Sequence, residues 1–358
     1  MSPRTRRGRL CPAAHIVQVI LRQSLGKIMA ETVLVTGGAG YVGSHAASLL
    51  VERGYTIVVV DDLSTGHRAA VPAEAAFVKL DLADQEGVRA LFRAHRFDAI
   101  MHFAALSLVG ESMKDPLRWI GDNTGNAVKL LRAAAEAKVG RFVLSSTAAL
   151  FDPVGDRPID EQTPVAPQSP YGDSKHMVER LLHWADQVLG IRSACLRYFN
   201  AAGAHPSGNI GEDHKPETHL IPIVIEAALG KRPAVTVFGQ DYATPDGTCV
   251  RDYVHVLDLA DAHIAVLEPL KTRSLRFNLG TGTGHSVRQV IRAVEEVSGR
   301  KVPVEYGPRR PGDTGTLVAD PGAIKRALGW TPRYPSLHAI VETAWRWHER
   351  HPNGYGAG

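Results

Sequence analysis

From Glu31 onward the chain alternates short runs rich in β-branched residues with longer amphipathic stretches. This alternation is typical of a parallel sheet with helices on both faces, because two parallel strands must be joined by a crossover of roughly a dozen residues or more. Six units of this kind predict an α/β fold, a Rossmann-type doubly wound parallel sheet, over residues 30–199. The runs expected to form its buried strands are 32–36, 56–60, 76–80, 98–104, 141–146 and 191–199.

A smaller C-terminal α/β lobe for the substrate is predicted over residues 200–352. It begins where the alternation breaks into a stretch that contains many Gly, Pro and His residues. We expect a strand at 276–280 and helices at 286–299 and 337–351 in this lobe, from their apolar periodicity. A segment at about 250–260 is expected to return to the first domain.

The first 29 residues are expected to be a disordered arm, or to precede a natural start at Met29; a signal or transit peptide is the alternative. Residues 1–28 hold six basic side chains and no acidic ones, which leaves 35 basic against 37 acidic residues in the rest of the chain. A body this close to neutral gives no reason to expect a nucleic-acid or membrane partner.

The cysteines favour a reducing, cytoplasmic location. Cys11, Cys195 and Cys249 are far apart and show no CxxC spacing, which indicates neither a disulfide framework nor a thiolate metal site. We therefore predict no metal. The sequence also has no run of about 18 apolar residues that could span a bilayer.

A glycine-rich turn follows the first expected strand. Gly37, Gly40 and Gly43 stand at GxxGxxG spacing and open a helix that is expected to stop at Gly54. Such a turn lets a pyrophosphate approach the N–H groups at the positive end of the helix. Asp61 ends the second strand, where a carboxylate can accept from both ribose hydroxyls and would repel a 2′-phosphate, which favours NAD over NADP.

Asp81, at the end of the third strand, has two readings. It either meets the adenine edge or forms a turn, which is a common use of Asp.

The segment PYGDSK places Tyr171 and Lys175 four residues apart, on one helix face. A phenol with a pKa of about 10 is a poor base at neutral pH, and a neighbouring ammonium together with the positive nicotinamide lowers that pKa. Thr147 ends a strand 24 residues earlier and can hydrogen-bond the same substrate oxygen. The three residues are candidate catalytic groups.

Eight segments together carry a resemblance to a known family: TGGAGYVGSH, DDLSTGH, MHFAALSLVGES, LSSTAALF, PYGDSK, LRYFNAAGAHPSG, FGQDYATPDGTCVRDYVHVLDLADAH and RRPGDTGTLVAD. The chain resembles the UDP-glucose 4-epimerases of the extended short-chain dehydrogenase/reductase superfamily, from Glu31 to the C-terminus. The stretch DGTCVRDYVHVLDLADAH is specific to the epimerase branch, whereas the glycine motif and the Tyr/Lys pair are shared by the whole superfamily.

The resemblance implies an isomerase with tightly bound NAD, which interconverts UDP-glucose and UDP-galactose through a transient 4-keto sugar. Tyr171 would be the acid/base, Thr147 its partner, and Lys175 the residue that tunes the phenol and holds the nicotinamide ribose. The implied cofactor contacts are Gly37, Gly40, Tyr41, Val42, Gly43, Asp61, Asp62, Asp81, Leu82, Phe103, Ala104, Ala105, Asn123, Lys175 and Tyr198. The implied substrate contacts are Thr147, Tyr171, Asn200, His219, Leu220, Phe238, Arg251, Arg310, Asp313 and Leu317. A homodimer through helices at roughly 119–137 and 171–189 is also implied.

The sequence departs from the family pattern at several positions. Phe151 and Asp152 replace a Tyr-Gly pair, and the loop after them is one residue shorter than in the bacterial form. Ser107 stands for a lysine that contacts NAD in some relatives, and His219 for an asparagine near the sugar. Leu317 stands where some members have a tyrosine that limits the sugar 2-substituent, so a larger N-acetyl group could enter.

Three other functions are weighed against this one. A 4-epimerase acting on UDP-N-acetylglucosamine or on a UDP-pentose remains open. A nucleotide-sugar 4,6-dehydratase would carry an Asp-Glu pair where this chain has Ala148 and Ala149. A non-catalytic NAD-binding protein could use the same fold, since a fold does not fix a function, but the presence of both Tyr171 and Lys175 argues against it.

Overall fold

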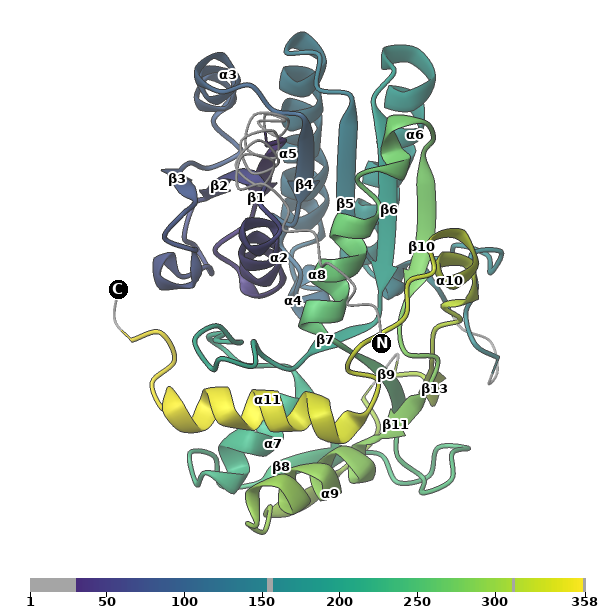
Figure 1. The fold of residues 1–358 in the computed structure, drawn as a ribbon. Helices are drawn as coiled ribbons and strands as arrows, with labels where there is room; N and C mark the ends of the chain where they lie inside the picture. Colours follow the sequence, from purple (N-terminus) through teal and green to yellow (C-terminus); the bar gives the residue numbers. More distant parts are fainter. Residues whose placement is uncertain (1–29, 153–156, 311–312, 357–358) are drawn as a thin grey trace, which may run out of the picture.

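The structure is a computed structural model that describes residues 30–152, 157–310 and 313–356 (Figure 1). The segment 1–29, with Cys11 and the predicted arm or targeting peptide, lies outside the described residues. So does most of the shortened loop after Asp152. Cys195 and Cys249 are both buried and unpaired. Within the described part of the chain, the helices are all too short or too polar to cross a membrane.

The larger lobe is built on a seven-stranded parallel sheet in the order β10-β6-β5-β4-β1-β2-β3. This order confirms the predicted doubly wound fold, and each of the six predicted strands is present. The direction of strand addition reverses between β1 and β4, and ligands of such sheets bind at the carboxyl ends of the strands beside this point. The strands are β1 (Thr32–Thr36), β2 (Thr56–Asp61), β3 (Ala76–Lys79), β4 (Ala99–His102), β5 (Arg141–Thr147), β6 (Arg192–Tyr198) and β10 (Leu275–Leu279).

Helices cover both faces of this sheet, which explains why its strands are nearly continuous apolar runs. On one face α2 (Tyr41–Glu52) packs against α8 (Val256–Ala265), and both contribute to a core with β1, β2 and β10. On the other face lie α3 (Gln85–Ala94), α5 (Pro116–Glu136) and α6 (Pro170–Leu189). Two short helical turns, α4 (Val109–Ser112) and the 3₁₀ segment Ala148–Leu150, follow β4 and β5.

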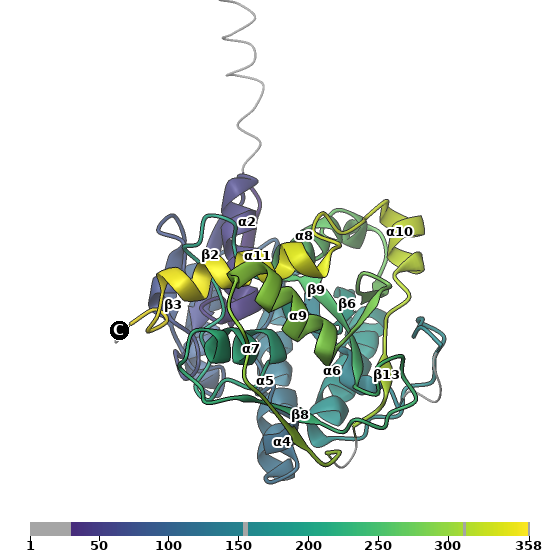
Figure 2. The ribbon, with the colours of Figure 1, turned by 90° about the horizontal axis from the view of Figure 1, so that it is seen from below.

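The smaller lobe, at the bottom of Figure 1, surrounds a separate apolar core. Its helices α7, α9 and α11 pack against one another, as the view from below shows (Figure 2). The two predicted helices are confirmed as α9 and α11; Ser286 caps the first with a capping box and Gly299 ends it in the left-handed conformation. The elements are β7 (Asn200–Ala202), α7 (Leu220–Ala228), β8 (Val235–Phe238), β9 (Val250–His255), β11 (Gly284–Ser286), α9 (Val287–Ser298), β12 (Val304–Gly307), β13 (Thr316–Leu317) and α11 (Leu337–Arg350).

One strand assignment was wrong. The strand predicted at 276–280 for the smaller lobe is β10, and it pairs in parallel with β6 at the edge of the large sheet. The later helix α10 (Gly322–Leu328) also packs on β10, and its Ile324 belongs to the same core. An apolar run identifies a strand but carries no information about which sheet it joins, because that depends on pairing with a distant segment.

The segment at about 250–260, which was expected to return to the first domain, has one part in each lobe. Its strand β9 belongs to the small sheet, where it pairs with β7, β11 and β13. Its helix α8 packs against α2 in the larger lobe. The chain therefore crosses between the lobes near His255, whose ring stacks on Tyr334 with a centroid distance of 4.2 Å.

Candidate active site

The start of α6 places Tyr171 and Lys175 at the end of the large sheet. The Ser169 hydroxyl accepts a hydrogen bond from Gly172 N at 3.1 Å, and Pro170 occupies the first turn, so the helix begins directly before the tyrosine. A Cβ on Gly172 would lie 2.3 Å from Ala149 O. Only glycine lets this helix start approach the segment after β5 so closely, and the approach brings Tyr171 beside the end of that strand.

Thr147 is the last residue of β5 and is oriented by its own backbone. Its hydroxyl oxygen accepts from Ala149 N at 3.0 Å, which leaves the hydroxyl proton to donate elsewhere. Burial raises the pKa of the Tyr171 phenol above its usual value and nearby Tyr198 adds to this, whereas hydrogen bonding with Thr147 lowers it. The structure therefore brings Thr147 and Tyr171 together, and in this environment burial outweighs the lowering predicted from the neighbouring cation.

Lys175 lies one helical turn further on and is almost fully buried. Its ammonium donates to Ser145 O at 2.9 Å. Burial lowers its pKa to about 8, against the opposing effect of the Glu179 carboxylate. Tyr198 lies nearby, with its phenol oxygen 2.7 Å from the Ser145 hydroxyl. The ends of β5 and β6 and the first two turns of α6 thus form one constellation of proton-carrying groups.

The glycine turn has the shape of a dinucleotide cradle. Gly37 has a φ of +71°, and a Cβ there would lie 2.4 Å from Ala104 N, while a Cβ on Gly43 would lie 2.1 Å from Gly37 O. Gly40 precedes α2 without any side-chain cap, so the first N–H groups of that helix remain available for an anionic ligand. These features fit the pyrophosphate of a dinucleotide.

Asp61 is held beside this turn by backbone donors. Its carboxylate accepts from Ala39 N at 3.0 Å and from Leu63 N at 2.9 Å, and burial raises its pKa above the usual range. Asp62 accepts from Ser64, and Asp81 accepts from Ala83 N at 2.8 Å, so both close local turns in this structure.

The other predicted cofactor residues come from α2, from α5 and from the segments after β3 and β4. The Asn123 amide donates to Leu106 O at 3.0 Å and to the Ser174 hydroxyl at 3.0 Å, and it accepts from Leu106 N. It thereby holds the segment after β4 to α5 and α6. Tyr41 donates to Gly203 O at 2.6 Å. Several others are buried or half-buried: Val42, Leu82, Phe103, Ala104 and Ala105. Ser107, by contrast, is exposed.

The predicted substrate residues fall into separate groups. Asp313 forms ion pairs with two arginines: its Oδ2 lies 3.0 Å from Arg310 Nε, and its Oδ1 lies 3.6 Å from Arg251 Nη2. The Arg310 guanidinium lies over the Phe238 ring at 4.8 Å. This patch has a net charge of +1 from two guanidinium groups, which suits a diphosphate.

Leu317 packs against an apolar cluster that includes Phe151, directly after the Thr147 strand. Asn200 lies in β7, paired with Tyr253, and Leu220 is the first residue of α7.

His219 lies apart from the arginine patch, in a different group of side chains. Its Nδ1 contacts the buried carboxylate of Glu212, and His214 contacts the same carboxylate at 3.1 Å. Glu217 completes the group. Sequence reasoning missed this cluster, although the repeated Glu-x-His spacing of GEDHKPETH was a usable signal.

The sequence is similar to many known enzymes. A model of the NAD dependent epimerase/dehydratase family matches residues 33–280. The UDP-glucose 4-epimerase of Halalkalibacterium halodurans is 47% identical over 325 residues, which cover 90% of this chain and 97% of that one. Two solved structures are also similar to this chain. The Brucella ovis UDP-glucose 4-epimerase in complex with NAD is 42% identical with a TM-score of 0.86, over 89% and 98% of the two chains. The UDP-Glc/GlcNAc 4-epimerase of Campylobacter jejuni is 40% identical with a TM-score of 0.79, over 90% and 100%.

The family match spans more than half of the chain, and the similarity to curated relatives runs over nine tenths of it. The glycine cradle, the doubly wound sheet and the Thr147, Tyr171 and Lys175 constellation are consistent with that match. The chain belongs to the NAD-dependent epimerase/dehydratase family.

Proposed function

We propose that this chain is an NAD-dependent UDP-glucose 4-epimerase, an isomerase of nucleotide sugars that acts in galactose metabolism. The proposal is supported by Thr147, Tyr171 and Lys175 lying together at the carboxyl edge of the sheet, the same edge as the glycine turn. Relatives described above are named UDP-glucose 4-epimerases.

The residues of this chain divide the chemistry between them. Tyr171 Oη takes the proton from the C4 hydroxyl of the sugar and later returns it to the oxygen of the 4-keto sugar. The Thr147 hydroxyl oxygen accepts from Ala149 N, so its proton can be donated to the C4 oxygen of the sugar and hold that oxygen in place. The Lys175 ammonium supplies positive charge beside a phenol whose burial opposes ionisation. When bound, NAD supplies the acceptor and donor of the C4 hydride, and its regeneration in each cycle predicts tight retention.

The remaining site residues hold the two ligands. The glycine turn and Asp61 bind the dinucleotide, as their geometry fits. Arg251 and Arg310 grip the diphosphate of the UDP-sugar, with Asp313 orienting both side chains. The sugar is anchored through its nucleotide and can therefore present either face to the catalytic groups.

Purified protein without added cofactor should convert UDP-galactose to UDP-glucose, with both C4 epimers followed by chromatography. Conversion without added NAD is expected, because the cofactor is regenerated in each turnover. A chain that binds NAD and converts no UDP-sugar would instead support the non-catalytic alternative, and a requirement for stoichiometric added NAD would contradict the cycle proposed here.

Substrate range depends on Leu317. Leu317 lies against Phe151, which follows β5, the strand that ends at Thr147. Because leucine is smaller than tyrosine, we expect the native chain also to epimerise UDP-N-acetylgalactosamine. The variant Leu317→Tyr should lower kcat/KM for that substrate by about 10- to 200-fold, the range for steric discrimination in a pocket, and leave UDP-galactose conversion nearly unchanged. Leu317→Met, which conserves volume, is the matched control. Equal loss on both substrates would show that Leu317 does not select at the 2-position.

The protein is further proposed to form a homodimer through α5 and α6. Of the nine exposed large apolar side chains in the described residues, seven lie on α4, α5, α6 and their connections: Val109, Met113, Leu117, Met177, Trp184, Val188 and Leu189. Exposed apolar side chains gathered on two helices that pack together favour an interface there. Light scattering should give twice the mass of one chain, and Trp184→Glu should give one chain mass. Tyr306→Glu, at an exposed site on β12, is expected to leave the dimer intact.

A cytoplasmic location is part of the same proposal. It rests on the free thiols of Cys195 and Cys249, which suit a reducing compartment. The partner is a UDP-sugar, and nothing in the charge of the chain body calls for a nucleic acid.

A further inference from the structure

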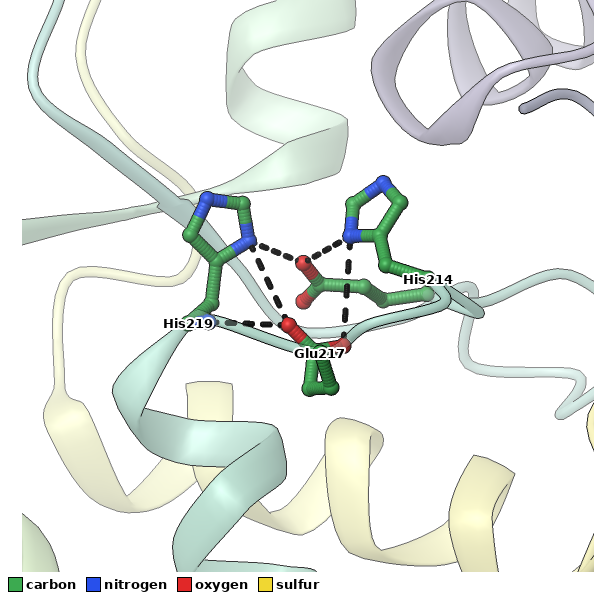
Figure 3. Close-up of side chains that lie close together, drawn as sticks. His214, Glu217 and His219 are labelled. Atoms are coloured by element: carbon green, nitrogen blue, oxygen red, sulfur yellow. Dashed lines mark hydrogen bonds and ion pairs between the residues drawn. The ribbon is translucent and has the colours of Figure 1, made fainter. Parts of the chain in front are cut away.

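The loop between β7 and α7 brings two glutamates and two histidines to one point. Glu212, His214, Glu217 and His219 each present one ligand atom, and these four atoms all lie within 4.8 Å of one another. Figure 3 shows His214 and His219 directing the same type of ring nitrogen, Nδ1, towards the carboxylates from two sides. Four donors from eight consecutive residues thus converge on a volume the size of one ion.

The spacing of the donors fits a tetrahedral metal ion. Four ligands at about 2.0–2.2 Å from a zinc ion lie about 3.3–3.6 Å from one another at tetrahedral angles. In the structure His214 Nδ1 lies 3.1 Å from Glu212 Oε1 and 3.8 Å from Glu217 Oε2. His219 Nδ1 lies 3.9 Å from Glu217 Oε1. These three distances lie close to the tetrahedral edge. His219 Nδ1 and Glu212 Oε1 are in direct contact, closer than that edge, so an ion enters only when these two side chains move apart.

Charge and burial favour an ion at this point. The side chains of Glu212 and Glu217 are only 3% and 4% exposed, although they are like charges directed at the same space. In the absence of an ion, the carboxylates pair with the two imidazoles as imidazolium groups. A divalent cation would take the place of those two protons and leave the net charge of the cluster unchanged. Imidazole and carboxylate are both zinc ligands, and a zinc ion held by four protein ligands is tetrahedral.

The cluster is rigidly supported, as ligands of a metal site are. Glu217 Oε1 accepts from the backbone N of Thr218 at 2.7 Å and of His219 at 2.8 Å, which fixes its orientation. Glu212 O accepts from the indole of Trp347 at 2.9 Å on α11. Tyr355 bonds to Gly211 through its hydroxyl. The backbone that carries the ligands is therefore held by the C-terminal helix and by the segment that follows it.

We propose that Glu212, His214, Glu217 and His219 form a structural site for a divalent transition-metal ion, best matched by zinc. Its four protein ligands leave no open position for substrate, so the ion would stabilise the fold and take no part in catalysis. His214 packs edge-on against Tyr41 with a centroid distance of 6.2 Å, and Tyr41 opens the helix that follows the glycine turn. The ion therefore fixes the loop of the smaller lobe against the cofactor-binding turn. In this assignment His219 is a metal ligand and not a sugar contact.

The test is the metal content of the full-length protein, expressed with zinc in the medium and purified without chelators or metal resins. Mass spectrometry of the metal should find about one zinc ion per chain. His214→Gln and Glu217→Gln each remove one ligand and should lower zinc retention at least about tenfold. His338→Gln, at an exposed position on α11 away from the cluster, is the matched control and should keep the ion.

A second measurement uses the native chain alone, so that it tests the proposal even if the ligand variants fold poorly. The native chain, stripped of metal and titrated with Co²⁺, should develop the strong visible absorption of tetrahedral cobalt, and added Zn²⁺ should raise its melting temperature. A native chain that holds no zinc and leaves Co²⁺ with the weak spectrum of the hydrated ion overturns the proposal and makes the cluster a set of His–Glu ion pairs. Zinc retention by both ligand variants at the native level overturns it as well. The epimerase assay above is independent of either outcome.

Discussion

Replacing Tyr171 with phenylalanine is expected to lower kcat for UDP-galactose by about 10²- to 10⁴-fold, the usual contribution of a positioned general acid–base group. The phenol is the buried proton carrier next to Thr147, and phenylalanine keeps the ring while removing the hydroxyl. Because no charged group is lost and the ring volume is kept, the variant should fold and retain NAD as the native protein does.

The measurement is single-substrate kinetics on purified protein, with bound NAD quantified in the same samples. Tyr306→Phe is the matched control, because it makes the same chemical change at an exposed position on β12. Its kcat should equal that of the native chain. If Tyr171→Phe retained activity within about threefold, a different group would have to move the C4 proton, and the proposed role of Tyr171 would be wrong.

Removing the carboxylate of Glu179 is expected to cost about 3–5 kcal/mol of folding free energy. Glu179 accepts from Arg197 Nε at 2.9 Å and Nη2 at 2.5 Å, and from the Ser146 hydroxyl at 2.7 Å. The side chains of Arg197 and Glu179 are only 2% and 4% exposed. Glu179→Ala would leave the guanidinium charge buried without a counter-ion, which is the costly case for such pairs.

Urea unfolding of Glu179→Ala, compared with the native protein, measures this loss. Glu342→Ala is the control, since it breaks an exposed glutamate–arginine pair on α11 and should cost less than about 1 kcal/mol. The double variant Glu179→Leu, Arg197→Met should be more stable than Glu179→Ala, because it removes both charges at once. Equal midpoints for Glu179→Ala and Glu342→Ala would show that the buried pair is not a source of stability.

The same buried pair connects stability to the site. Glu179 lies one turn after Lys175 on α6, and its bonds to Ser146 and Arg197 tie that helix to the ends of β5 and β6. The Arg197 guanidinium also lies 5.3 Å from the centre of the Phe151 ring. Phe151, one of the residues that depart from the family pattern, therefore packs between this buried pair and Leu317.

The sequence by itself determined the parts of this protein that depend on neighbours along the chain. Strand runs, the glycine turn at Gly37 and the one-turn separation of Tyr171 and Lys175 are all local, because period and spacing fix which residues share a face. Helix ends were predicted for the same reason, since Ser286 and Gly299 act on the backbone next to them. The doubly wound fold and the candidate catalytic groups follow from these features.

Only the tertiary structure decided what depends on distant segments and on burial. It placed β10 in the large sheet, because sheet membership requires a partner strand 81 residues away in the pairing of Leu275 with Ala194. It raised the pKa of Tyr171 through desolvation, an effect that no spacing rule contains. It also brought Glu212, His214, Glu217 and His219 together. The Glu-x-His repeat is visible in the sequence, but only the folded loop turns both carboxylates and both imidazoles towards one point.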